Sequence, residues 1–219
     1  MFYRHAKEKP GNETKKNLLG GFTLLETLVT IFVFTLLMGG VAILFKTVFT
    51  TSIQQTKALN TADQARKVAF NFTNEIRNAT TGNDGAYPIN RADDSQIIFF
   101  SRYGSSGTAV NRIRYYVSTN TLYKGIVAPG GGSPTYNLST EVVRPVQTGL
   151  ANGSIPAFYY FNDTYAGTTT PLVQPVNINQ IKFVKINLVL FKQDVNNATT
   201  TFTVNAGTTI RNLKTNLGN

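Results

Sequence analysis

Residues 20–30, GGFTLLETLVT, decide the fold, because they open the longest apolar run in the chain and place a carboxylate inside it. Residues 27–45 carry no charged side chain. With residues 22–25 added, the apolar span reaches the length of a helix that crosses a hydrocarbon core of ~30 Å. The sequence therefore predicts a membrane-spanning segment over residues 22–45.

The charges around this segment predict its orientation. Residues 1–20 are basic, and they hold two acidic residues against five basic ones: Arg4, Lys7, Lys9, Lys15 and Lys16. Basic flanks stay in the cytoplasm, so we expect the N-terminus inside and everything after Lys46 exported. The apolar run ends without the small-residue pattern of a signal-peptide cleavage site, so cleavage on the far side is not expected.

Glu26 has two explanations that need not compete. Thr23 and Glu26 have the T-x-x-E spacing of a capping box, which satisfies free backbone donors at the start of a helix. The carboxylate also lies within membrane depth, where ionisable groups are expensive and mark functional positions. Capping alone does not explain the two glycines that precede Phe22.

Taken together, the basic leader, Gly21, Phe22 and the run FTLLETLVTIFVFTLLMGG resemble the cleavage and methylation segment of type IV prepilins and pseudopilins. The resemblance implies that a membrane peptidase cuts after Gly21 and that Phe22 becomes the N-methylated first residue. Glu26 would then form an assembly charge pair with the Phe22 amine of a neighbouring subunit. The alternative is an uncleaved membrane anchor with a flexible glycine pair.

Beyond Lys46 the sequence predicts that the helix continues as an amphipathic segment to residue 79. Apolar side chains recur at three- and four-residue intervals: Ala58, Ala62, Ala65, Ala69, Phe72 and Ile76. Gly39 and Gly40 interrupt the apolar half, either as a point of melting or bending on assembly or as a site of close helix packing. The expected organisation is a leader (1–21), an apolar half-helix (22–45), an amphipathic half-helix (46–79) and an extracytoplasmic β-rich domain (80–219).

The last segment, residues 80–219, contains short strand-like runs and turn signals but no second long helix. The runs begin at residues 95, 111, 121, 139, 157, 178 and 199, and they predict a mainly antiparallel sheet. The run at 178–191 is apolar on both faces, so we expect a central strand. A long helix on such a sheet is an α+β fold that resembles the pilin fold, with features of minor pseudopilin J and related minor pilins.

Sequence motifs for catalysis are absent. The chain has no cysteine, one histidine in the leader, and no nucleotide-binding, hydrolase or zinc-protease motif, so we expect no enzyme, no cofactor and no metal site. Asp84, Asp93 and Asp94 suggest calcium ligands only weakly, because their spacing does not match an EF-hand.

We therefore expect a structural subunit of a type IV pilus or a type II secretion pseudopilus, a minor pilin or pseudopilin near the tip, involved in protein transport or filament assembly. The resemblance implies four partners: a prepilin peptidase/methyltransferase, other pilin or pseudopilin subunits, an inner-membrane assembly platform and membrane lipid. The expected location is the inner membrane, single-pass, and then the filament. A competence subunit that contacts DNA through Arg112, Arg114 and Tyr116 is the alternative, and a solvated strand face is the simpler explanation of those side chains.

Overall fold

The computed structural model describes residues 20–102, 109–130, 135–193 and 199–213. The chain's own contacts divide it into two units, one ending at Phe49 and the other beginning at Thr50. One helix, α1 (Leu24–Arg77), contributes to both units. The expected leader, up to residue 19, lies outside the described residues.

The second half of α1 has the amphipathic character that its sequence predicted. Ala65, Ala69, Phe72 and Ile76 are buried, whereas Asp63 and its neighbours on the other side are exposed. The helix ends at Arg77, two residues before the predicted end, and Ala79 instead bridges to Ser101. Packing against the sheets therefore determines which face of α1 is buried, and the turn residues after Arg77 determine where the helix ends.

Within the described residues, eight strands form two antiparallel sheets. The first sheet has the sequential order β1 (Ile89–Ala92), β2 (Gln96–Ser101), β3 (Asn111–Ser118), β4 (Thr121–Val127) and β5 (Val142–Thr148). The second has the order β6 (Phe158–Phe161), β7 (Phe183–Gln193) and β8 (Thr199–Thr209). The α+β class is confirmed, with two sheets where the sequence suggested one.

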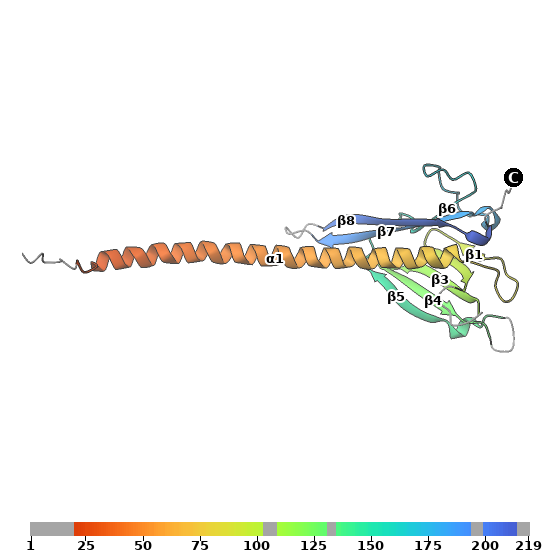
Figure 1. Cartoon of the computed structure of the whole chain (residues 1–219), viewed down its shortest axis with the longest axis horizontal. Coiled ribbons are helices and arrows are strands. Elements are labelled where there is room, and N and C mark those ends of the chain that lie inside the picture. Colours follow the sequence, from red (N-terminus) through yellow and green to blue (C-terminus); the bar gives the residue numbers. More distant parts are fainter. Residues whose placement is uncertain (1–19, 103–108, 131–134, 194–198, 214–219) are drawn as a thin grey trace, which may run out of the picture. The chain divides into compact units, whose positions relative to one another are not determined.

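Phe72 of α1 is the centre of the core between helix and sheets. Its ring lies 6.2 Å from Phe99 on β2, 5.2 Å from Tyr115 on β3 and 5.6 Å from Phe158 on β6, measured between ring centroids. In Figure 1 the second half of α1 runs alongside β7 and β8 on one side and β3, β4 and β5 on the other. A single aromatic side chain thus joins the helix to both sheets.

The prediction of a central strand in the run at 178–191 is also confirmed, because β7 lies between β6 and β8. On one face of β7 the side chains are fully buried: Val184, Ile186, Leu188 and Leu190. On the opposite face Val189 is buried, but Phe191 is 44% exposed, so that cover is partial. Strand β7 pairs with β6 on one edge and with β8 on the other, so it is the central strand of the second sheet.

Several predicted boundaries differ from the structure. Strands β3 and β4 have the predicted bounds, β5 begins three residues late, and β1 was not predicted at all. Residues 178–180 form a 3-10 helix, η2 (Ile178–Gln180), instead of the start of a strand, because the Asn177 side chain accepts a bond from the Asn179 amide. The part of the chain that the structure describes has two further 3-10 helices, η1 (Leu138–Thr140) and η3 (Arg211–Leu213).

Candidate functional site

The predicted cleavage position lies immediately before α1. Gly20, Gly21 and Phe22 precede the helix, and the Phe22 side chain is 80% exposed. Thr23 caps the helix, because its hydroxyl accepts a bond of 3.3 Å from the Glu26 amide and its carbonyl accepts one of 3.2 Å from the Thr27 amide. The Thr23 half of the predicted capping box is therefore present.

The Glu26 carboxylate has no hydrogen-bond or ion-pair partner among the described residues. The neighbouring hydroxyls bond to the backbone instead: Thr27 donates to the Leu24 carbonyl at 2.8 Å and Thr30 to the Glu26 carbonyl at 2.6 Å. Glu26 is exposed, like every residue from 20 to 50. Its carboxylate is therefore available to a group outside this chain.

The apolar half of α1 has the length and composition of a membrane-spanning helix. An 18-residue window has a mean hydropathy of 2.6, and none of it is buried within the protein. Gly39 and Gly40 lie inside the continuous helix, and a Cβ built on either would meet no atom of the described residues within 4 Å, apart from the backbone of the helix itself. Within one chain, neither glycine is required by packing.

The buried face of α1 carries a carboxylate, Glu75, that the sequence pattern was not used to predict. Glu75 of α1 is 5% exposed, accepts a bond of 2.9 Å from the Tyr115 hydroxyl, and forms an ion pair with Lys124 of β4. Burial, followed by the Glu75 charge and the hydrogen bond to Glu75, raises the pKa of Tyr115 above its usual range. The position of Glu75 between Phe72 and Ile76 was the available signal, because it placed a carboxylate on the apolar face.

The side chains proposed for DNA contact are mostly engaged within the chain. Arg114 forms a two-pronged ion pair with Glu141, with bonds of 2.9 and 2.5 Å, and its guanidinium lies 4.1 Å from the Tyr116 ring centroid. Burial lowers the pKa of Arg112, against the opposing effect of the Glu141 charge. The geometry favours a structural role for this strand face, and DNA contact stays a prediction.

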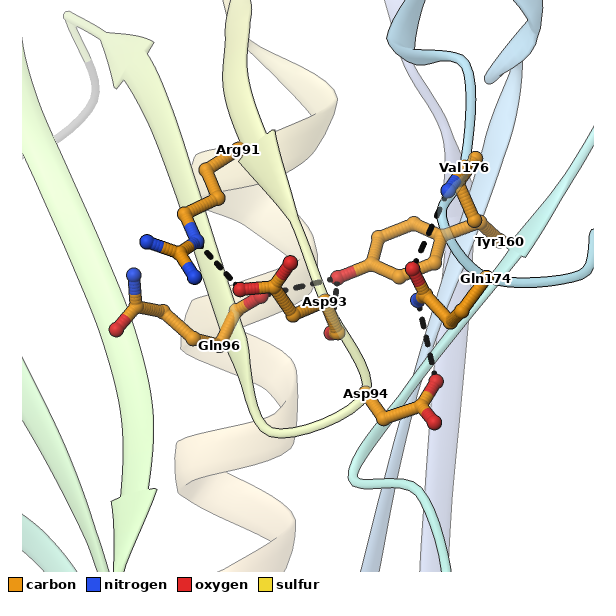
Figure 2. Close-up of polar contacts among 7 residues, drawn as sticks. All are labelled: Arg91, Asp93, Asp94, Gln96, Tyr160, Gln174 and Val176. Atoms are coloured by element: carbon orange, nitrogen blue, oxygen red, sulfur yellow. Dashed lines mark hydrogen bonds and ion pairs between the residues drawn. The ribbon is translucent and has the colours of Figure 1, made fainter.

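The acidic turn at Asp93 and Asp94 holds the two sheets together, as Figure 2 shows. Asp93 forms an ion pair with Arg91, and the Tyr160 hydroxyl donates a bond of 2.8 Å to the Asp93 carbonyl. The Asp94 carboxylate accepts a bond of 3.1 Å from Gln174. Burial and these two acidic charges raise the pKa of Tyr160.

The third acidic residue considered for calcium does not join this turn. The Asp84 carboxylate accepts a bond of 3.1 Å from the Ala86 amide, within its own turn. Among the described residues, no group of three or more metal-ligating side chains lies together. The three aspartates are therefore explained by turn and inter-sheet contacts.

Comparison with known proteins gave no assignment. No protein-family model matches the chain, and no curated protein matches it significantly. The functional argument therefore depends on the residues themselves.

Proposed function

We propose that this chain is a minor pilin or pseudopilin, a non-enzymatic subunit that enters a type IV pilus or a type II secretion pseudopilus through α1. Its N-terminus is cytoplasmic, and its β-rich domain is extracytoplasmic. The partners in this proposal are a prepilin peptidase that also methylates, other pilin-like subunits and an inner-membrane assembly platform.

One observation carries the proposal: Gly21, Phe22 and Glu26 stand in the prepilin order at the start of an apolar helix that the protein itself does not bury. An ordinary anchor needs only the apolar helix. The glycine before Phe22 and the carboxylate four residues after it have no role in such an anchor beyond capping.

In this proposal each of the three residues has a distinct physical role. Gly21 has no side chain, which leaves the scissile bond accessible next to the helix. Cleavage converts the Phe22 amide into a cationic amine, and methylation keeps it cationic. A buried cation and a buried carboxylate are tolerable only as a pair, so the Glu26 carboxylate of one subunit receives the Phe22 amine of another.

The intact mass of the chain extracted from membranes tests the proposal. We expect a mature chain that begins at N-methylated Phe22 and lacks residues 1–21. A Gly21→Leu variant should retain the leader, whereas Gly20→Ala, one residue before, should be processed normally. A wild-type chain that retains residues 1–21 would refute the proposal and favour the uncleaved anchor.

Glu26→Gln tests the assembly charge pair separately. We expect normal membrane insertion and processing, and incorporation into filaments reduced by at least about tenfold, because the neighbour's amine would be left unpaired. Thr23→Ala is the matched control, since it removes the cap but keeps the carboxylate. If Thr23→Ala impairs incorporation as strongly as Glu26→Gln, then Glu26 acts only through capping.

A further inference from the structure

The outer edge of β8 is unprotected, unlike the other strand edges within the described residues. The edge strands there are β1, β5, β6 and β8, and β1 and β6 have only 4 residues each. Strand β5 contains Pro145, and its pairing with β4 shifts register. Short length, proline and bulges keep sheet edges from pairing with other chains. Strand β8 has 11 residues, TTTFTVNAGTT, with no proline, no charge and an unbroken register with β7.

The backbone groups along this edge point away from β7. On β7 the Asn187 amide donates a bond of 2.8 Å to the Ala157 carbonyl, on the side opposite β8. Its cross-strand partner Asn205 therefore belongs to a widely spaced pair and directs its N–H and C=O groups outward. The same orientation recurs at every second residue: Thr201, Thr203, Asn205 and Gly207. No hydrogen bond from the rest of the described chain reaches these outward groups.

The side chains of β8 alternate between two different surroundings. Phe202, Val204 and Ala206 are partly buried and pack against the hydrophobic core, whereas Thr203 and Asn205 are exposed. The apolar row thus ends at β8 with part of its surface uncovered, and side chains of an added strand would extend it. A segment that fits this edge is extended, bonds through its backbone and has apolar side chains at every second position.

The charge around this edge is positive. Lys185 and Lys192 lie on β7, Arg211 follows the end of β8, and neither strand contains an acidic residue. None of these three cations forms an ion pair within the described residues. Asp194, in the connection between the two strands, lies outside the described residues. The charge therefore favours an acidic partner segment over a neutral or basic one.

A second copy of the chain fits this edge less well. Two β8 edges that pair antiparallel about Val204 place Thr200 of one copy opposite Thr208 of the other. Lys192 is the β7 partner of Thr200, and Arg211 lies three residues after Thr208, so the basic residues of the two copies would meet. Neither β8 supplies an acid to balance them. The charge therefore favours a different protein as the partner.

We infer that the outer edge of β8 binds an extended acidic segment of another protein as a fourth strand of the second sheet. The backbone of that segment exchanges hydrogen bonds with residues such as Thr203 and Asn205. Its apolar side chains cover the exposed parts of Phe202 and Val204, and its acidic side chains lie near the lysines and the arginine. The inference goes beyond the proposed function, and it needs neither cleavage after Gly21 nor filament assembly.

Binding of a fluorescein-labelled peptide to the full chain in neutral detergent micelles tests the inference, with fluorescence anisotropy as the readout. The probe is the peptide Asp-Val-Thr-Val-Thr-Val-Asp, and the comparison peptide has lysine in place of both aspartates. We expect saturable binding of the acidic peptide and binding of the basic peptide that is weaker by at least about tenfold. Absence of saturable binding, or equal binding of the two peptides, would overturn the inference.

Thr203→Pro tests whether binding uses the backbone of β8. The substitution removes an N–H group that points away from β7, and an edge strand accepts proline at such a position. It should weaken binding about tenfold, because a bond to the peptide is lost and an acceptor on the peptide is left unpaired. Thr203→Ala is the matched control, since it keeps the N–H group and should bind like the wild type. Equal affinities of the two variants would contradict backbone pairing.

A pair of charge variants tests the acidic character of the partner. Lys192→Gln with Arg211→Gln should weaken binding of the acidic peptide about fivefold. Lys67→Gln with Arg144→Gln removes equal charge from α1 and β5 and should change binding little. An equal loss in both double variants would show attraction by net charge alone and would refute a partner bound at β8.

Methylated peptides give a test that leaves the protein unchanged, so it decides even where a β8 variant fails to fold. Alternate amides of an extended peptide lie on opposite edges. N-methylation of one alternating set should prevent binding, and methylation of the other set should be tolerated. The same effect from both sets would rule out strand addition. Sedimentation of the chain in micelles covers the remaining occupant: a dimer that Thr203→Pro dissociates would assign the edge to a second copy and overturn the inference.

Discussion

The two halves of α1 are parts of one helix, yet they meet opposite surroundings. In the first half every residue from Leu24 to Phe49 is exposed, including bulky side chains such as Phe32 and Leu36. In the second half one face of the helix is buried, with exposures of 1% or less at Ala65, Ala69 and Phe72, while other apolar side chains such as Phe70 lie exposed away from that face. An all-round apolar helix requires lipid or other subunits, whereas a one-sided helix is complete within its own domain.

This difference teaches that the two halves respond to separate kinds of change. Substitutions in the second half should alter the unfolding free energy of the domain, because its core consists of residues from Ala65 onward. Substitutions in the first half should alter insertion or assembly and leave domain unfolding unchanged. The following predictions test that separation, from the largest expected effect to the smallest.

The largest effect is expected for Phe72→Ala. Phe72 is fully buried and contacts both sheets, so its removal should reduce the unfolding free energy by about 3–5 kcal/mol. Phe70→Ala is the matched control, because Phe70 lies two residues away and is 63% exposed. It should cost no more than about 0.5 kcal/mol. Denaturant unfolding in micelles, followed by tyrosine circular dichroism, measures both, and equal losses would contradict the proposed core.

The next effect concerns the buried ion pair. Lys124→Met leaves the Glu75 carboxylate buried without its cation and should cost about 2–3 kcal/mol. Glu75→Gln combined with Lys124→Met should recover most of that loss, because no buried charge remains and the amide oxygen can still accept the bond from the Tyr115 hydroxyl. The same unfolding measurement applies. A double variant that is less stable than Lys124→Met would show that the pair stabilises the fold in itself.

Alkaline pH should destabilise the domain. The pKa values of Tyr115 and Tyr160 are raised in the folded chain, so both keep their protons when unfolded tyrosines lose them near pH 10. The unfolded state then binds fewer protons, and stability that is fully present below pH 10 is lost as the pH rises. Each tyrosine contributes a slope of about 1.4 kcal/mol per pH unit. Unfolding free energies measured across this range should fall, and Tyr115→Phe should make the fall less steep.

A smaller effect is expected at Gly125 of β4. A Cβ at this position would overlap the Glu141 carboxylate, which forms the two-pronged pair with Arg114. Gly125→Ala should therefore displace Glu141 and cost about 1 kcal/mol, since the pair is partly exposed. In a Glu141→Ala background the same substitution should cost nearly nothing. An unchanged cost in that background would place the strain elsewhere.

The smallest effect on the domain is expected for Gly39→Ala combined with Gly40→Ala. No described residue lies within 4 Å of the added methyl groups, apart from the backbone of the helix itself, so domain unfolding should change by less than about 0.5 kcal/mol. Filament incorporation measured in parallel separates the two hypotheses for these glycines. A loss of incorporation, with insertion and domain stability unchanged, supports a role in assembly by bending or close packing. A loss of domain stability would break the separation of the two halves.

Local pattern was enough to predict most elements but not their arrangement. Strands β3 and β4 were predicted to the residue because each alternates or is bounded by clear turns. Strand β1 was missed, since its four residues, INRA, have no strand pattern of their own and it forms by pairing with β2. The separation of β6, β7 and β8 into a second sheet is likewise set by pairing, which a run of apolar residues does not encode.

The candidate site divides in the same way. Gly21, Phe22 and Glu26 lie within six positions of one another, so the sequence alone showed their spacing. Cleavage after Gly21 and pairing of Glu26 with a neighbouring subunit stay predictions. The Arg114–Glu141 pair could not be predicted in this way, because its partners are 27 residues apart.

By itself the sequence determined the apolar segment, the amphipathic face of α1 and most strands, because each depends on the spacing of neighbouring residues along one element. Only the tertiary structure decided that the Glu75 carboxylate would be paired with Lys124, 49 residues later. The physical reason is that this match depends on the position of the helix against the sheet and on the strand register, and a one-residue shift of β4 would turn Lys124 to the opposite face.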